Sequence, residues 1–267
     1  MQALWQGDIS FGLVNIPVKL YAAIKEHVLG FNVLCKKCHS SLHYERWCPK
    51  CKKEIDWNDT VKGLKLPSGK MFVIDQDELK KLKPEKTDTI DIVEFVKINQ
   101  VNPIYFKSHY YIAPTQKSGK SFYLLQKALE SEKKAAIGRF VMRDKEYTSL
   151  IQPYENILLL NTLNYSYEIR PIGKINTVKK TTVNQAELNL AKTLINKLTK
   201  KKFDISQFKD TFAQKLKKRI EQSKKGKKIK KEKTTSQKRT KQEPLLSALK
   251  ASLIAPGHSN PTARAKK

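Results

Sequence analysis

The chain has 267 residues, with 53 lysines and arginines against 25 aspartates and glutamates, so its formal net charge at pH 7 is +28. Hydrophobic residues make up 39% of it, enough for one or two globular domains, which argues against disorder along the whole length. The longest aliphatic run, Ile157–Leu160, is far shorter than the roughly 20 residues of a membrane-spanning helix. Met1–Gly12 lacks the apolar stretch of a signal peptide. We therefore expect a soluble, cytoplasmic protein without a membrane partner.

The positive charge is spread over the whole chain. Residues 223–267 hold 14 basic and 2 acidic side chains, a net charge of +12, and residues 1–222 carry the remaining +16. A charge so far from zero attracts polyanions and says nothing about fold. DNA, RNA and anionic lipid are the polyanions to consider.

The first half of the chain is rich in predicted strands. Trp5–Ala22 alternates apolar residues with small or polar ones, which is the pattern of β-strands. Pro17 within it indicates a sheet edge or an irregularity, because proline cannot donate a hydrogen bond to the ladder. Further along we expect a hairpin over 61–74 around a Pro-Ser-Gly turn, a helix of one or two turns over 76–82, and strands over 89–98 and 104–112.

The second half mixes helices with strands. A helix is predicted over 121–134 by the spacing of Phe122, Leu125, Ala128 and Leu129. Strands are predicted over 136–143 and 157–169, with Gln152-Pro153 breaking the pattern between them.

Two more helices are predicted near the end of the folded part. The helix over 184–201 has a capping box of Asn184 and Glu187, and an apolar stripe of Leu188, Ala191, Ile195 and Leu198. A second helix is predicted over 205–222. The element pattern predicts an α+β fold in which a barrel or sandwich precedes a helical region.

After Gln222 the composition becomes lysine-rich and polar. Such a run cannot bury a core, so we expect a flexible basic linker over 223–243. The apolar cluster at Pro244–Ile254 is predicted to form a short amphipathic segment. It is either a peptide that docks on a partner or an apolar stretch without a function in a disordered end.

The four cysteines, Cys35, Cys38, Cys48 and Cys51, form two CxxC pairs separated by nine residues. Two such pairs can place four thiolates on one Zn²⁺ ion, so we predict a structural zinc ribbon over 33–55. His39 and His43 are alternative ligands. Four thiolates leave no open position for catalysis. The chain lacks the glycine-rich and nucleophile motifs of nucleotide hydrolysis and acyl transfer, and no organic cofactor is predicted.

Three long motifs closely resemble the prokaryotic Ku family. They are the N-terminal run WQGDISFGLVNIPVKLYAA, the segment EIDWNDTVKG after the cysteines, and the run KALESEKKAAIGRFVMRDKE. They occur in the family's order, and the resemblance covers roughly residues 1–250. It implies a Ku-type β-barrel core with an extended arm over 1–180, a helical C-terminal region over 181–222 and a flexible Lys-rich tail over 223–267. The zinc ribbon would then be a small insertion in the core.

The resemblance also implies a function. Family members are non-enzymatic homodimers whose two copies form a ring around duplex DNA. They bind double-stranded DNA ends without reading sequence, protect and bridge double-strand breaks, and recruit an ATP-dependent DNA ligase of the ligase D type for non-homologous end joining. A nucleoid-associated location follows. The strong positive charge agrees with binding that addresses phosphates.

For the DNA-facing surface we favour Arg139 and Arg143, which would share one face of a strand while Phe140 and Met142 face the core. The alternative is a solvated barrel exterior. Further candidates are Lys117, Lys120, Lys145, Lys19, Lys174, Lys179 and Lys180.

Two other functions stay open on the sequence alone. A basic barrel with a zinc ribbon also suits an RNA-binding or ribosome-associated module. A DNA-processing metalloenzyme would need an incomplete thiolate set or a carboxylate cluster.

Overall fold

The computed structural model divides the chain into two compact units, Met1–Lys174 and Ile175–Lys267, each described by itself below. Within the described part of the chain, no helix is long and apolar enough to cross a membrane. The residues described are 1–25, 30–85, 87–175, 181–224 and 245–254.

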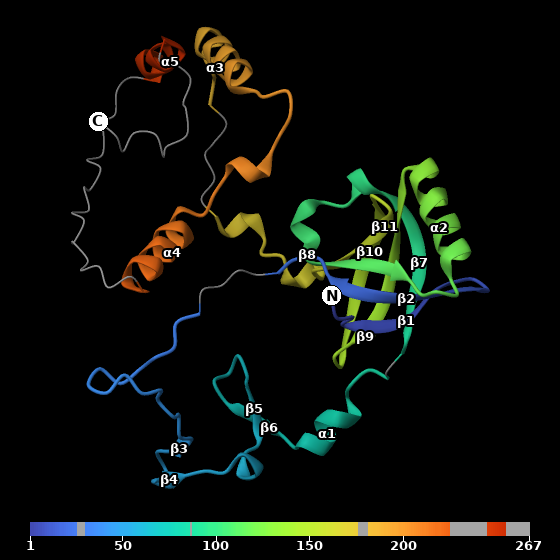
Figure 1. Ribbon diagram of the computed structural model, residues 1–267, viewed down its shortest axis with the longest axis vertical. Helices are drawn as coiled ribbons and strands as arrows, with labels where there is room; N and C mark the ends of the chain where they lie inside the picture. The colour runs from blue at the N-terminus through green and yellow to red at the C-terminus, as the bar shows by residue number, and fades with distance from the viewer. Residues whose placement is uncertain (26–29, 86, 176–180, 225–244, 255–267) are drawn as a thin grey trace. The chain divides into compact units, whose positions relative to one another are not determined.

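The first unit is built on a closed β-barrel (Figure 1). Around it the strands follow the order β1-β2-β8-β11-β10-β9-β7, and β7 pairs with β1 to close the circle. Neighbouring strands are antiparallel except at that seam, where β7 and β1 run parallel. Of the two predicted architectures, barrel and sandwich, the structure therefore confirms the barrel. Its strands are β1 (Trp5–Phe11), β2 (Val14–Ala22), β7 (Thr89–Lys97), β8 (Phe106–Pro114), β9 (Lys134–Met142), β10 (Lys145–Tyr154) and β11 (Ile157–Leu163).

Two strand predictions were wrong in detail. Strand β10 was missed because we took Gln152-Pro153 as a break, whereas Pro153 lies inside the strand opposite Leu158. Pro153 stands one residue from the strand's end, where a missing N–H donor is tolerated. The strand predicted over 157–169 ends at Leu163, since the chain then turns through the 3-10 helix η4 (Ser166–Glu168).

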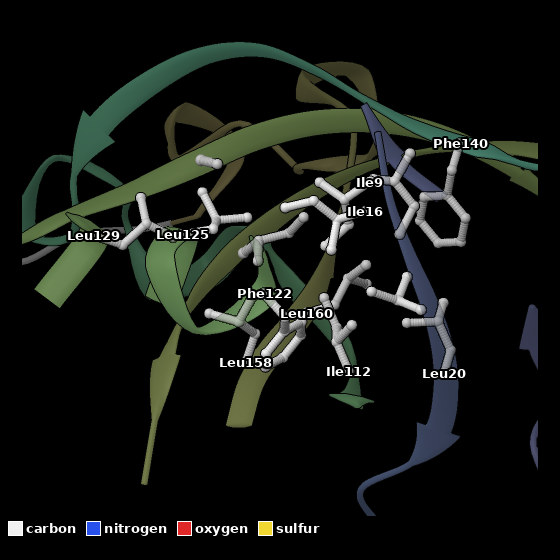
Figure 2. Close-up of a cluster of buried hydrophobic side chains, with 14 of the residues drawn as sticks. Ile9, Ile16, Leu20, Ile112, Phe122, Leu125, Leu129, Phe140, Leu158 and Leu160 are labelled. Carbon is white, nitrogen blue, oxygen red and sulfur yellow. The ribbon is translucent and has the colours of Figure 1, made fainter. Parts of the chain in front are cut away.

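Alternate residues of the strands fill the barrel, as the period of two requires. In β2, Ile16, Val18 and Leu20 are fully buried. Helix α2 (Gly119–Glu132) adds Phe122, Leu125 and Leu129 to the same cluster, which Figure 2 shows.

Helix α2 differs from its predicted stripe at two positions. Ala128 is exposed, while Gln126 is buried. The side-chain amide of Gln126 donates to the carbonyl oxygens of Glu155 (2.9 Å) and Ile157 (3.3 Å), so the helix is hydrogen-bonded to the β10–β11 connection. The apolar period could not reveal this polar contact.

Barrel closure depends on a glycine in β1. A Cβ at Gly7 would lie 2.1 Å from the carbonyl oxygen of Asp88 and 2.5 Å from the Trp5 ring. The next N–H, that of Asp8, donates to the same Asp88 oxygen at 2.8 Å. The chain entering β7 therefore approaches β1 more closely than any residue with a side chain allows.

Residues 23–88 form the insertion between β2 and β7, where the resemblance implies an arm. The predicted hairpin is confirmed, with its turn at Gly69 (φ 83°), and the predicted short helix begins after Asp75, whose carboxylate accepts the Gln76 N–H. The elements are β3 (Trp47–Cys48), β4 (Lys53–Glu54), η1 (Trp57–Asp59), β5 (Lys62–Lys65), β6 (Met71–Ile74) and α1 (Gln76–Lys81).

The second unit contains α3 (Gln185–Leu198), α4 (Thr211–Lys224) and α5 (Leu245–Ile254). Asn184 caps α3 as predicted, since its side chain accepts the Ala186 N–H at 2.9 Å. The continuous helix predicted over 205–222 was wrong. Asp204 starts only the 3-10 helix η6 (Ile205–Gln207), and α4 begins afresh at Thr211, where Asp210 accepts the Ala213 N–H at 3.0 Å. Two N-caps in succession interrupt the apolar period.

Helix α5 packs against α3 within the second unit. The Lys197 ammonium donates to the Leu253 carbonyl oxygen at 2.5 Å, at the C-terminal end of α5. Leu190, Ala191 and Leu194 of α3 are half-buried. Of the predicted stripe, Leu188, Ile195 and Leu198 are instead exposed.

The predicted basic linker is only partly visible. Ser223 and Lys224 belong to α4, so the linker cannot begin at Ser223. Its remainder, 225–243, lies outside the described residues, as does 255–267. The apolar segment Pro244–Ile254 does contain a helix, α5.

Candidate nucleic-acid interface and cysteine turns

Arg143 and Lys145 lie where β9 turns into β10. Arg143 and Asp144 both have left-handed backbone conformations, with φ of 53° and 62°, as a two-residue type I′ hairpin turn requires. Lys145 opens β10 opposite Met142. Both cationic side chains are exposed, and Lys83 holds the Asp144 carboxylate at 2.6 Å. The turn thus presents two cations to solvent.

The prediction that Arg139 and Arg143 share one strand face was wrong. Strand β9 ends at Met142, so only Arg139 stands on it. Phe140 and Met142 are buried, as predicted. The alternation of apolar and polar residues continues beyond the end of the strand, so the sequence pattern does not reveal the turn.

Arg139 is exposed but lies among carboxylates. Its partner in β7 is Asp91, and it lines a cavity of about 420 Å³ that Asp91, Glu85 and Glu146 also line. The negative charge along this cavity weakens the attraction of the guanidinium for a phosphate. No sequence pattern could show this, because Asp91 lies in β7, Glu146 in β10 and Glu85 in the connection before β7, and only the tertiary fold brings these segments together.

Lys117 and Lys120 flank the start of α2, Lys117 in the preceding turn and Lys120 in the first helical turn. The hydroxyl of Ser118 donates to the carbonyl oxygen of Pro17 at 2.5 Å, which ties this turn to β2. Lys19 is a half-buried residue of that strand. The structure thus connects the segments that carry these three lysines, while Arg143 and Lys145 occupy a different turn.

The other lysine candidates lie near the end of the first unit. Lys174 closes the 3-10 helix η5 (Ile172–Lys174). Lys179 and Lys180 lie outside the described residues.

The candidate cations whose side chains the structure describes form no ion pair with another described residue. Within that part of the chain, the lysines that pair with carboxylates are Lys80, Lys83, Lys107, Lys127 and Lys134. None of these is a predicted DNA contact. The described candidates Lys19, Lys117, Lys120, Arg143 and Lys145 therefore keep their charge for an external anion.

Each CxxC pair forms a turn of the same shape. His39, which follows Cys38, has φ 56° and donates its N–H to the Cys35 carbonyl oxygen at 2.8 Å. Lys52, which follows Cys51, has φ 51° and donates to the Cys48 carbonyl oxygen, also at 2.8 Å. Both turns therefore end on a left-handed residue with the same hydrogen bond.

The thiols of these turns have shifted pKa values. Hydrogen bonds from Ser40, and then one with Cys35, lower the pKa of Cys38 to about 7. The Cys51 N–H, 3.5 Å from the Cys48 sulfur, lowers the pKa of Cys48, and the contact with Cys48 raises the pKa of Cys51. Thiolates are the form that binds metals.

All four cysteines are free, and across the described ranges no group of three or more His, Cys, Asp or Glu side chains surrounds a common point. The structure thus shows two separate cysteine turns. The thiol chemistry of each pair fits zinc, and the turns are not gathered into one four-ligand centre. His39 and His43 are exposed.

Sequence reasoning missed one further feature of the first unit. Tyr165 and Tyr167 stack with their ring centroids 5.4 Å apart and an angle of 8° between the ring planes. The two residues flank Ser166 in the 3-10 helix η4, which we had assigned to a strand. A strand also places residues two apart on one side, so the spacing by itself held no clear signal.

These features define a basic β-barrel protein whose exposed cations suit the backbone of a nucleic acid. The chain belongs to the Ku family: the family model described as the Ku70/Ku80 beta-barrel domain matches residues 10–190.

Relatives named "Non-homologous end joining protein Ku" match most of the chain. That of Bacillus subtilis is 36% identical over 222 residues, 82% of this chain and 71% of its own length. That of Solibacter usitatus is 37% identical, covering 94% and 93%. That of Archaeoglobus fulgidus is 34% identical, covering 96% and 99%.

Proposed function

We propose that the chain binds the ends of linear double-stranded DNA, without reading sequence, in non-homologous end joining. The observation that carries this proposal is the family match over the barrel, together with relatives that are named for that pathway and are matched over nearly their whole length. The net charge of +28 supports it, because every DNA sequence presents the same phosphates to lysine and arginine. The chain acts here as a binding protein without catalysis of its own.

We assign the phosphate contacts first to Arg143 and Lys145, on their exposed turn, and to Lys117 and Lys120 at the start of α2. Their exposure and their freedom from ion pairs with described residues support this choice. Arg139 contributes less, because three carboxylates line the same cavity. Lys19, Lys174, Lys179 and Lys180 complete the proposed set.

Two copies of the chain are proposed to form a ring. A closed ring loads only from a terminus, which explains a requirement for DNA ends. The β5–β6 hairpin supports an interface, since Leu64, Met71, Phe72 and Val73 are all exposed. Apolar side chains gathered on a small hairpin suit coverage by a second copy. Sedimentation analysis of the full chain at micromolar concentration tests this, and a monomer would contradict it.

The ring is further proposed to recruit an ATP-dependent DNA ligase. The second unit supports a docking role, because Ile205, Phe208, Phe212 and Ile220 leave apolar surface exposed around η6 and α4. Retention of the ligase by the full chain, lost when Phe208 and Phe212 become serine, tests this step.

The zinc site is proposed to be structural. Cys35, Cys38, Cys48 and Cys51 would hold Zn²⁺, which supplies folding free energy when it joins two thiolate pairs. The matching turns and the lowered pKa of Cys38 support this assignment.

An exonuclease protection assay tests the proposed function. A linear duplex is incubated with the chain and a double-strand-specific exonuclease, and unlabelled linear duplex or folded RNA is added as competitor. We expect the chain to protect the terminal nucleotides, and only the duplex to abolish protection. Equal competition by folded RNA would favour the RNA-binding alternative.

A further inference from the structure

The stacked tyrosines of η4 form an exposed aromatic platform on the first unit. Tyr165 is half-buried, whereas Tyr167 is 81% exposed although its ring lies nearly parallel to that of Tyr165. One face of Tyr167 is thus partly overlapped by an aromatic neighbour, and the side chain otherwise meets solvent. An apolar ring held in this way offers its free face to a planar ligand.

The platform is fixed by contacts to two barrel strands. Glu168 accepts the Tyr165 N–H at 2.8 Å, which closes the 3-10 turn, and this hydrogen bond lowers the pKa of Glu168. The other oxygen of Glu168 lies 3.3 Å from the ammonium of Lys107 in β8. The Tyr165 hydroxyl donates to the Glu146 carbonyl oxygen in β10 at 3.3 Å. Because the turn is ordered before binding, less conformational entropy is lost when a ligand stacks.

Exposed cations on the segments joined at this turn suit the phosphate of a nucleotide. Glu146, which holds Tyr165, follows Lys145 directly in β10, and Arg170 is exposed two residues after Glu168. Lys145 belongs to the proposed phosphate-binding set. A nucleotide combines a base that stacks on tyrosine with a phosphate that lysine and arginine bind. In an intact duplex both faces of each internal base are already stacked and only the terminal pair has a free face, so an unpaired base of an overhang is the ligand that best fits a single exposed ring.

We propose that Tyr167, supported by Tyr165, stacks an unpaired base of a single-stranded overhang at the DNA end. This inference rests on the proposed end-binding function and adds a preference among ends. The site is indifferent to base identity, because every base has a π-face. Tyr165 positions the ring, and Tyr167 makes the contact.

The test compares a blunt duplex with the same duplex carrying a three-nucleotide overhang at its 3′ or 5′ end, by fluorescence anisotropy with the full chain. We expect tighter binding of at least one overhang. Tyr167→Ala should lower affinity for that overhang roughly 5- to 150-fold, the range found for one stacked base, and leave blunt-end affinity unchanged. Tyr167→Phe keeps the aromatic face and should retain the preference.

Tyr44→Ala is the matched control, since Tyr44 is 82% exposed and makes no ring stack with another described aromatic residue. It should bind both DNAs as the wild type does. A Tyr167→Ala variant that keeps the wild-type ratio of overhang to blunt affinity, or a wild type without that preference, overturns the inference alone. Failure of the wild type to bind any DNA end overturns the proposed function with it.

Discussion

Replacing Gly7 by alanine tests how the barrel closes. The added Cβ would stand 2.1 Å from the Asp88 carbonyl oxygen, where an ordinary contact needs about 3.4 Å, so the β1–β7 seam must open by more than about 1 Å. Overpacking of this kind costs about 1–3 kcal/mol. The shift also weakens the Asp8–Asp88 hydrogen bond of 2.8 Å, a further loss of about 0.5–1.5 kcal/mol.

Alanine restricts the unfolded chain more than glycine does, and this smaller unfolded-state entropy stabilises the folded chain by about 0.5–1 kcal/mol. The net loss of unfolding free energy should therefore be about 2 kcal/mol, within a range of roughly 0.5–4 kcal/mol. Urea unfolding followed by tryptophan fluorescence measures it, because Trp5 packs edge-on against Phe140 at 6.0 Å while Trp47 and Trp57 are already exposed in the folded chain.

Gly119→Ala provides the control, because a Cβ at Gly119, the first residue of α2, meets no atom within 4 Å apart from its own chain neighbours and helix backbone. Its stability should stay equal or rise by up to about 1 kcal/mol. A Gly7→Ala variant within about 0.5 kcal/mol of the wild type would refute the reasoning, since surface substitutions commonly vary by that amount.

Three further outcomes follow from the site and the second unit. Arg143→Ala should weaken binding to all duplex sequences alike and reduce the slope of log affinity against log salt by about 1, whereas Arg139→Ala should reduce that slope less. Titrations between about 50 and 200 mM salt measure both slopes. A loss of affinity that depends on DNA sequence would count against phosphate contact. Cys48→Ser should abolish the zinc content measured by atomic absorption, and retention of wild-type zinc would exclude Cys48 as a ligand. Leu249→Asp, at a half-buried position of α5, should weaken the packing of α5 on α3 by about 2 kcal/mol and speed amide exchange in α5 more than tenfold. Lys250→Asp, at an exposed position of the same helix, is the control and should leave the exchange rate unchanged.

Most of the barrel was predictable, because its strands alternate residues that face the core and solvent. Ile16, Val18 and Leu20 show this period, and all three are fully buried. The period fails where local chemistry overrides it. Pro153 hid β10 although it lies in the strand, and Asp210 restarts a helix inside what looked like one continuous apolar stripe.

The candidate site was less predictable than the fold. The exposure of Arg143 follows from its turn, yet the left-handed conformation of two consecutive non-glycine residues has no clear sequence signal. The carboxylates that line the cavity beside Arg139 come from β7, β10 and the connection before β7, which only the tertiary fold brings together. Each cysteine turn follows from its CxxC spacing, whereas the gathering of both turns around one ion depends on contacts distant in sequence.

The most direct test of end binding is a gel-shift competition at ~150 mM salt, where nonspecific charge attraction is damped. Labelled linear duplex is challenged with unlabelled linear duplex and, separately, with the same duplex covalently closed into a circle. A ring that loads from DNA ends predicts that only the linear competitor displaces the label. Equal displacement by the circle would contradict it and leave a basic duplex-binding protein that uses the Ku fold without selecting ends.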